Sequence, residues 1–204
     1  IKDDGQLLRQ RNPDAVKRLT EALIGVGIAM AYAGNSRPAS GSEHHLSHFF
    51  EITGIINNRP YFMHGTDVAF STVYTCRMRE EILAVDIPEQ TEKFDRADWE
   101  KKIRSVYGIA ADGVIGLQDK AGVYNENKIA VYKEKWHEIR EILQDCPSAE
   151  EIVSYLGSVG LDISEFEKMY GKQKLENAKW FAKDLKDRYT VLWLYYSLFY
   201  HTKV

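Results

Sequence analysis

The sequence has few of the features that mark a specialised class of protein. Its 204 residues include only two cysteines and five prolines. Two cysteines are too few for a disulfide-dense secreted scaffold, so we expect Cys76 and Cys146 to be free thiols in a reducing compartment. No proline-rich linker, low-complexity stretch or internal repeat divides the chain, which indicates a single domain.

An excess of one charge and a long apolar run are lacking as well. The 27 basic and 30 acidic residues give a net charge of −3, which argues against a general binder of nucleic-acid phosphates. The strongly apolar stretch 191–200 is too short to span a bilayer as a helix, and it predicts a buried or docked helix. We therefore expect no nucleic-acid partner and no membrane span.

Common catalytic and nucleotide-binding motifs are missing too. The chain contains no P-loop, no G-x-S-x-G and no C-x-x-C. Gly25-Val26-Gly27 imitates the start of a dinucleotide fingerprint, but no strand precedes it and it falls inside a helical pattern. Any catalytic or binding site must therefore be formed by residues outside these motifs.

Helix signals, by contrast, recur along the whole chain. Asn12-Pro13-Asp14 predicts a helix start, and Gly34-Asn35 predicts the end of that helix. Gly25 and Gly27 inside it are costly in a helix, so we expect another backbone to approach closely there. A capping-box pattern over 40–43 predicts a second helix that continues to about Ile52 and is ended by Gly54.

The later part of the chain is also helical in pattern. No sustained period-two alternation indicates strands, so the predicted fold class is all-α with short connections. The further predicted helices or helix starts are 65–83, 98–107, 125–143, a capping box over 148–151, and a segment capped by Asp162 or Ser164.

Histidines are concentrated in one segment, because four of the six lie between residues 44 and 64. His44 and His48 are four residues apart on the predicted second helix, so their Cβ atoms should lie about 5–6 Å apart on one face. A loop precedes His64 and can fold it back beside that pair. Two imidazoles placed in this way can bind one metal, or one can bind while the other contacts substrate.

The spacing alone leaves alternatives open. The histidines could equally make structural hydrogen bonds, and His45 should point about 100° away from the pair. Asp67 could add a carboxylate ligand, although its position favours the first turn of a helix. The pattern is not H-E-x-x-H, so a zincin protease is unsupported.

The loop before the histidine helix is a candidate anion site. Backbone N–H groups at a helix start favour an anion, and Arg37 could add a bidentate contact to a phosphate. The alternative is that Ser40 and Glu43 only satisfy the helix end, with Arg37 paired to a carboxylate.

One run of residues resembles a known family. The pattern S-R-P-x-S-G-S-E-H-x-x-S-H over 36–48, followed by His64-Gly65, is similar to the glycerol-1-phosphate dehydrogenases, above all their bacterial AraM-like branch. These enzymes are part of the wider group of iron-containing alcohol dehydrogenases and glycerol dehydrogenases.

The resemblance implies a two-domain, dehydroquinate synthase-like fold, of which residues 1–204 form the helical carboxyl-terminal, metal- and substrate-binding domain. The chain opens with Ile1, and its first methionine is Met30. We therefore expect the amino-terminal domain, which binds NAD or NADP, to be absent from this chain. The aspartate that completes the family's metal site would be absent with it.

The resemblance also implies roles for the histidines. Family members hold one divalent metal with an aspartate and two histidines, and they interconvert dihydroxyacetone phosphate and sn-glycerol 1-phosphate. By the motif match, His44 and His64 are the expected metal ligands, and His48 is the expected substrate-binding, catalytic residue. The ligand types do not choose among zinc, nickel and iron.

Further expectations follow from the same resemblance: a small phosphorylated substrate, a homodimer, a cytoplasmic location, a part in phospholipid metabolism, and no activity of this chain by itself. Two other functions stay open. One is a dehydrogenase of the same group that acts on glycerol or a simple alcohol. The other is a non-catalytic helical interaction module with structural histidines.

Overall fold

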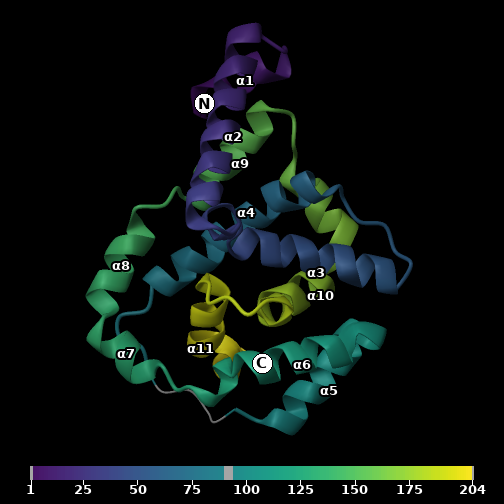
Figure 1. Ribbon diagram of the computed structural model, residues 1–204, viewed down its shortest axis with the longest axis vertical. Helices are drawn as coiled ribbons and strands as arrows, with labels where there is room; N and C mark the ends of the chain where they lie inside the picture. Colours follow the sequence, from purple (N-terminus) through teal and green to yellow (C-terminus); the bar gives the residue numbers. More distant parts are fainter. Residues whose placement is uncertain (1, 90–93, 204) are drawn as a thin grey trace.

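The computed structural model describes residues 2–89 and 94–203, and every regular element in these residues is helical (Figure 1). The predicted all-α class is confirmed. The α-helices are α1 (Gly5–Arg9), α2 (Pro13–Ala33), α3 (Ser42–Ile56), α4 (His64–Leu83), α5 (Arg96–Tyr107), α6 (Ala111–Ala121), α7 (Ile129–Glu134), α8 (Trp136–Gln144), α9 (Ala149–Ser158), α10 (Ile163–Phe181) and α11 (Val191–Lys203). The short 3₁₀ turns are η1 (Lys2–Asp4), η2 (Arg37–Ala39), η3 (Gly108–Ala110), η4 (Val123–Asn125) and η5 (Ala182–Leu185).

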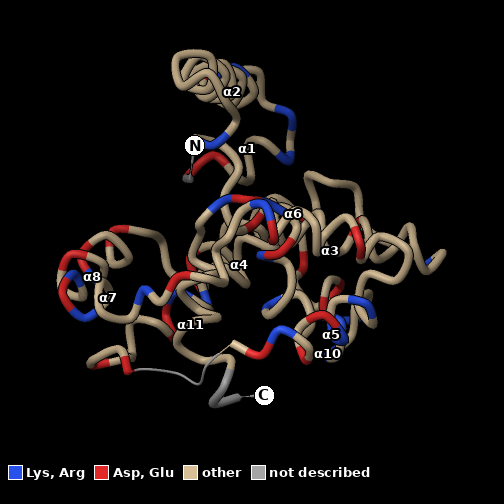
Figure 2. Tube along the Cα trace, turned by 60° about the horizontal axis from the view of Figure 1, so that its bottom comes forward, with Lys and Arg blue, Asp and Glu red and all other residues tan. Residues whose placement is uncertain are grey.

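The long helix α2 begins and ends where the sequence predicts. The Asn12 side chain accepts hydrogen bonds from two amides of the first turn, and Gly34 ends the helix with a left-handed φ of 66°. Figures 1 and 2 show α2 at one end of the molecule, away from the core helices. The prediction that Gly25 and Gly27 meet another backbone is wrong within the described chain, because no other segment lies within 4 Å of a Cβ built at either position.

The core lies where α3, α4, α10 and α11 pack together. Helix α3 buries Leu46, Phe49 and Phe50 along one face, and Phe70 of α4 is fully enclosed. The Phe50 ring stacks on the ring of Tyr170 from α10, with their centroids 4.1 Å apart. Each such side chain contributes about 1.5–3 kcal/mol by leaving water. This apolar face fixes the rotation of α3 and therefore the direction of its histidine face.

The apolar stretch 191–200 forms the buried part of α11. Leu192 and Tyr195 are enclosed, and the Tyr195 hydroxyl donates a hydrogen bond to Glu81 of α4 at 2.8 Å. In the part of the chain that the structure describes, no helix is long and apolar enough to cross a membrane. The two cysteines are free thiols, as predicted, with Cys76 buried in α4 and Cys146 exposed.

Several helix boundaries refine the predictions. The segment 125–143 is not one helix, because α7 and α8 are separated at Lys135, whose backbone leaves helical geometry. The predicted capping box is confirmed at α9, where Ser148 and Glu151 each bond the other's backbone amide. Asp162 caps α10 through the amide of Ser164.

Candidate metal centre

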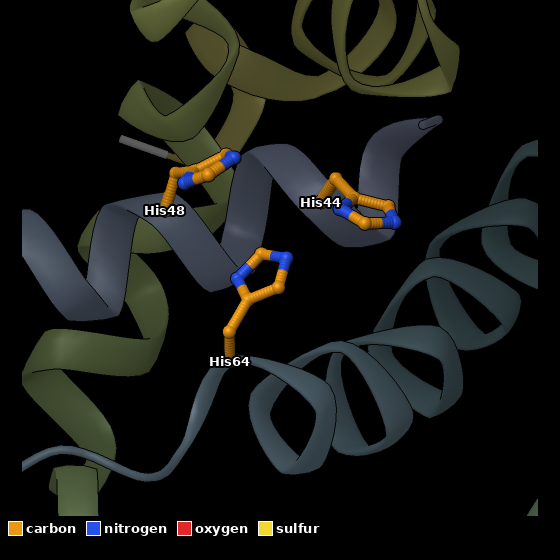
Figure 3. A group of neighbouring side chains, drawn as sticks. All are labelled: His44, His48 and His64. Carbon is orange, nitrogen blue, oxygen red and sulfur yellow. The ribbon is translucent and has the colours of Figure 1, made fainter. Parts of the chain in front are cut away.

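Three histidines from two helices converge at one place (Figure 3). His44 and His48 lie one turn apart on α3, and His64 is the first residue of α4. One ring nitrogen from each lies within 4.8 Å of the others. The His64 ring is 5.1 Å from the ring of His44 and 5.0 Å from that of His48, between centroids.

The loop between α3 and α4 brings His64 back along α3. Gly54 makes this return possible, since a Cβ there would lie 2.7 Å from the Tyr61 ring and 3.2 Å from the Arg59 carbonyl oxygen. The Phe62 amide donates to the Tyr170 hydroxyl of α10 at 3.1 Å, which fixes the loop to the core. The prediction that Gly54 ends the helix is wrong, because α3 continues to Ile56. The glycine provides room for the returning loop instead.

Hydrogen bonds orient the His64 ring. The buried Ser47 hydroxyl lies 3.0 Å from Nδ1 of His64 and 3.4 Å from its carbonyl oxygen. If that hydroxyl donates to the carbonyl, it accepts from Nδ1–H and leaves Nε2 free as a ligand atom. The Glu51 carboxylate lies 3.5 Å from Nδ1 of His48 and 4.0 Å from Nδ1 of His64. Both polar neighbours are side chains of α3.

Burial favours the neutral form of His44 and His48, the form in which imidazole binds metal. Burial lowers the pKa of His44, while the charge of Glu43 opposes this shift and that of Lys186 adds to it. Burial also lowers the pKa of His48, and the charge of Lys186 is the next cause. Two ligands in tetrahedral geometry around zinc have nitrogens about 3.4 Å apart. The cluster therefore fits one divalent ion after modest ring rotations.

His45 and Asp67 lie outside this group. His45 is fully buried, and burial lowers its pKa to about 3, with the charges of Lys186 and Arg188 adding to the effect. Neither ring nitrogen of His45 has a hydrogen-bond partner in the described chain. The Asp67 carboxyl accepts a hydrogen bond from the Tyr170 hydroxyl at 2.6 Å and lies in the first turn of α4. Among the described residues, the group whose ligand atoms all lie within 4.8 Å of one another consists of the three histidines, and the Glu51 carboxylate is near His48 and His64 only.

Two cations that sequence reasoning missed reach the start of α3. The Lys186 ammonium donates to the Ser40 hydroxyl at 3.3 Å. The Arg188 guanidinium donates to the Ser36 hydroxyl at 3.3 Å and to the Ser40 carbonyl at 3.5 Å. These partners are about 150 residues apart in sequence, so no spacing rule connects them. The available signal was the Lys-Asp-Arg run at 186–188 between η5 and the apolar stretch.

The capping box that the sequence predicts over 40–43 does not form at the start of α3. Gly41 is the residue before the helix, and no side chain caps it. The Glu43 carboxylate accepts from the Gly41 amide at 2.8 Å, while the Ser40 hydroxyl faces Lys186 rather than the first-turn amides. Arg37 is exposed, and within the described residues its guanidinium makes no hydrogen bond or ion pair. Its predicted place beside a phosphate stays a prediction.

A separate pocket of about 440 Å³ lies between α4 and α10 and contains none of the three histidines. Two ion pairs are part of its lining, Arg77 with Glu167 and Lys179 with Glu176, each at 3.1 Å.

Comparison with known proteins supports the resemblance carried by the motif. No family model matches the chain, and no solved structure does. Its curated relatives include the glycerol-1-phosphate dehydrogenase (NAD(P)⁺) of Bacillus licheniformis, 35% identical over 100 residues that cover 49% of this chain and 23% of the relative. The enzyme of that name from Geobacillus stearothermophilus is 26% identical over 189 residues, which cover 91% of this chain and 39% of the relative.

The relatives extend across bacteria and archaea. The Staphylothermus marinus enzyme of the same name is 43% identical over 68 residues, which cover 33% of this chain and 18% of the relative. The chain thus spans less than half the length of the curated relatives it matches. The predicted resemblance to this group is confirmed.

Proposed function

We propose that this chain, as a relative of the glycerol-1-phosphate dehydrogenases, is the metal- and substrate-binding part of a metal-dependent oxidoreductase. The complete enzyme interconverts dihydroxyacetone phosphate and sn-glycerol 1-phosphate. In this proposal residues 1–204 form the helical domain, and NAD or NADP binds a separate domain. The observation that carries the proposal is the convergence of His44, His48 and His64 within the family's motif.

In this proposal two of the histidines bind the metal ion and the third contacts the substrate. His44 and His64 hold the ion, together with a carboxylate from elsewhere in the complete enzyme. Zinc, nickel or iron, when bound, supplies Lewis acidity that favours negative charge on the carbonyl oxygen. His48 hydrogen-bonds the substrate oxygen or moves its proton, because its ring borders the same space.

Other residues of the chain hold these histidines in position. Ser47 holds Nδ1 of His64 and so keeps the ligand nitrogen directed at the cluster. The rigid apolar packing of α3 holds His44 and His48 in register. The cationic side chains of Lys186 and Arg188 favour a phosphorylated substrate over plain glycerol, since they bring positive charge to the start of α3, the helix that carries His44 and His48.

Metal affinity of single-histidine variants tests this proposal. Zn²⁺ binding to the chain is measured by equilibrium dialysis for the wild type, His44→Ala, His64→Ala and His48→Ala. We expect His44→Ala and His64→Ala to weaken binding at least about tenfold, and His48→Ala to weaken it much less. His137→Ala is the matched control, because His137 is an exposed histidine on α8.

The outcomes separate the competing functions. Full zinc affinity in both His44→Ala and His64→Ala would favour a helical interaction module with structural histidines. A loss in His48→Ala as large as in the other two would make His48 a ligand and remove its proposed substrate role. In the complete enzyme, equal turnover of glycerol and glycerol 1-phosphate would favour the simple-alcohol dehydrogenase.

A further inference from the structure

Lys186 and Arg188 reach the start of α3 together, and Glu43 at that helix start is the acid whose charge favours the charged form of Lys186. Both side chains are half-buried. In the described chain neither lies within ion-pair distance of a carboxylate, whereas neighbouring Lys183 pairs with Asp184 at 2.8 Å. Their hydrogen-bond acceptors are neutral oxygens of Ser36 and Ser40. Two adjacent cations with neutral partners form a ready site for an anion.

Lys186 reaches the start of the helix that carries two of the three histidines. Its ammonium donates to the Ser40 hydroxyl at 3.3 Å, and Ser40 lies just before α3. His44 lies in the first turn of that helix, four residues after Ser40. Lys186 and the first of the proposed metal ligands therefore border the same end of α3.

The backbone that carries Lys186 is held firmly. The buried Gln118 amide donates to the carbonyls of Asp184 and Lys186, at 2.9 and 3.1 Å. Just before them, the fully buried Lys183 ammonium bonds the Asp184 carboxylate and the Tyr124 hydroxyl. These bonds anchor η5 against the core. Lys186 thus projects from a fixed segment, which a specificity-determining cation needs.

The start of α3 adds directed donors at the same place. The amides of Ser42, Glu43 and His44 in its first turn have no acceptor within the described residues. They are the free N–H groups with which a helix start attracts an anion. The Ser40 side chain does not cap them, because it receives Lys186 instead.

We propose that Lys186, supported by Arg188, recognises the phosphate group of the substrate and sets the preference for phosphorylated over plain substrates. The inference rests on the proposed function and adds to it a specificity-determining cation that the motif does not contain. It makes Lys186, rather than exposed Arg37, the main phosphate contact. The phosphate oxygens accept from the ammonium and from the first-turn amides of α3, while the other end of the substrate faces the histidines.

Ligand binding to the zinc-loaded chain tests the proposal without needing turnover. Dihydroxyacetone phosphate, dihydroxyacetone and inorganic phosphate are titrated separately by calorimetry. The variants are Lys186→Met, Lys186→Arg and Arg37→Met, with exposed Lys168→Met on α10 as the matched control. Zinc content and the thermal midpoint of each variant are measured in parallel.

We expect Lys186→Met to weaken dihydroxyacetone phosphate and inorganic phosphate at least tenfold, with dihydroxyacetone affinity and zinc content unchanged. Lys186→Arg should retain most of the phosphate affinity, and Lys168→Met all of it. The proposal is overturned if Lys186→Met binds dihydroxyacetone phosphate like the wild type, if Arg37→Met alone shows the loss, or if the wild type binds zinc but no phosphate. Loss of zinc binding in the histidine variants is measured separately, so failure of the metal site is distinguishable from failure of this inference.

Discussion

The carboxyl of Asp67 has no exposed surface and lies three residues after His64 on α4. One oxygen accepts from the Tyr170 hydroxyl, and the other has no partner among the described residues. Burial raises the pKa of Asp67 to about 7, against an ordinary value of 3.8. The charge of Lys174 and the Tyr170 hydrogen bond oppose this shift, while the charge of Glu51 adds to it. At neutral pH the group is therefore poised between its two forms.

This raised pKa predicts a pH-dependent effect of Asp67→Asn. Between pH 4 and 7 the folded state keeps a proton that the unfolded state has lost, so the wild type loses stability as pH rises through that window. The amide is neutral at every pH and keeps an oxygen for Tyr170. We expect the variant to gain stability relative to the wild type, from little at pH 4.5 to on the order of a few kcal/mol at pH 8. Urea unfolding at both values measures this, and parallel pH profiles would refute it.

Residues of the site differed in how far the sequence could predict them. His44 and His48 share a helix, so the four-residue spacing alone puts them on one face. The return of His64 needed the motif, since the loop path depends on Gly54 and on the bond to Tyr170. Lys186 could not be predicted, because its place beside Ser40 results from the packing of η5 on the core. The sequence predicts interactions between residues that are close in the chain. It does not predict the contact between Lys186 and Ser40, which are 146 residues apart.

At the scale of elements, helix boundaries were predictable where the capping groups are local. Asn12 and Ser148 cap the helices that the sequence assigned to them, because each bonds amides within three residues. The capping-box pattern at Ser40 gave a wrong prediction, because the Ser40 hydroxyl accepts a hydrogen bond from Lys186 of a distant segment. The break between α7 and α8 at Lys135 likewise has no local glycine or proline to announce it.

Alanine substitutions in α2 test whether the fold of this chain requires glycine at positions 25 and 27. Because no other described segment approaches Gly25 or Gly27, alanine at either position adds a methyl group into open space. Each substitution should raise the free energy of unfolding by about 0.5–1 kcal/mol, since alanine loses less backbone entropy in a helix. Gly34→Ala is the matched control and should destabilise, because φ is 66° there. Urea denaturation measures all three, and destabilisation by Gly25→Ala would contradict an open α2 face.

At the scale of the whole molecule, the histidine cluster connects α3 and α4, two helices that pack against each other in the core. One ring nitrogen of each histidine lies within 4.8 Å of the others, and two cations from the segment between η5 and α11 reach the start of α3. Segments far apart in the sequence therefore meet at this helix. An ion held there stabilises the packing of α3 on α4 only in the folded state.

Metal binding should therefore raise the stability of the entire fold. A ligand that binds only the folded chain adds about 2.7 kcal/mol when its free concentration is one hundred times its dissociation constant. For a domain of this size that increment corresponds to a rise in thermal midpoint of roughly 5–10 °C. We expect saturating Zn²⁺ to produce this rise, a chelator to reverse it, and His64→Ala to abolish it while His137→Ala preserves it. Differential scanning calorimetry measures the midpoints, and an equal zinc-induced shift in His64→Ala would place the stabilising ion elsewhere than between α3 and α4.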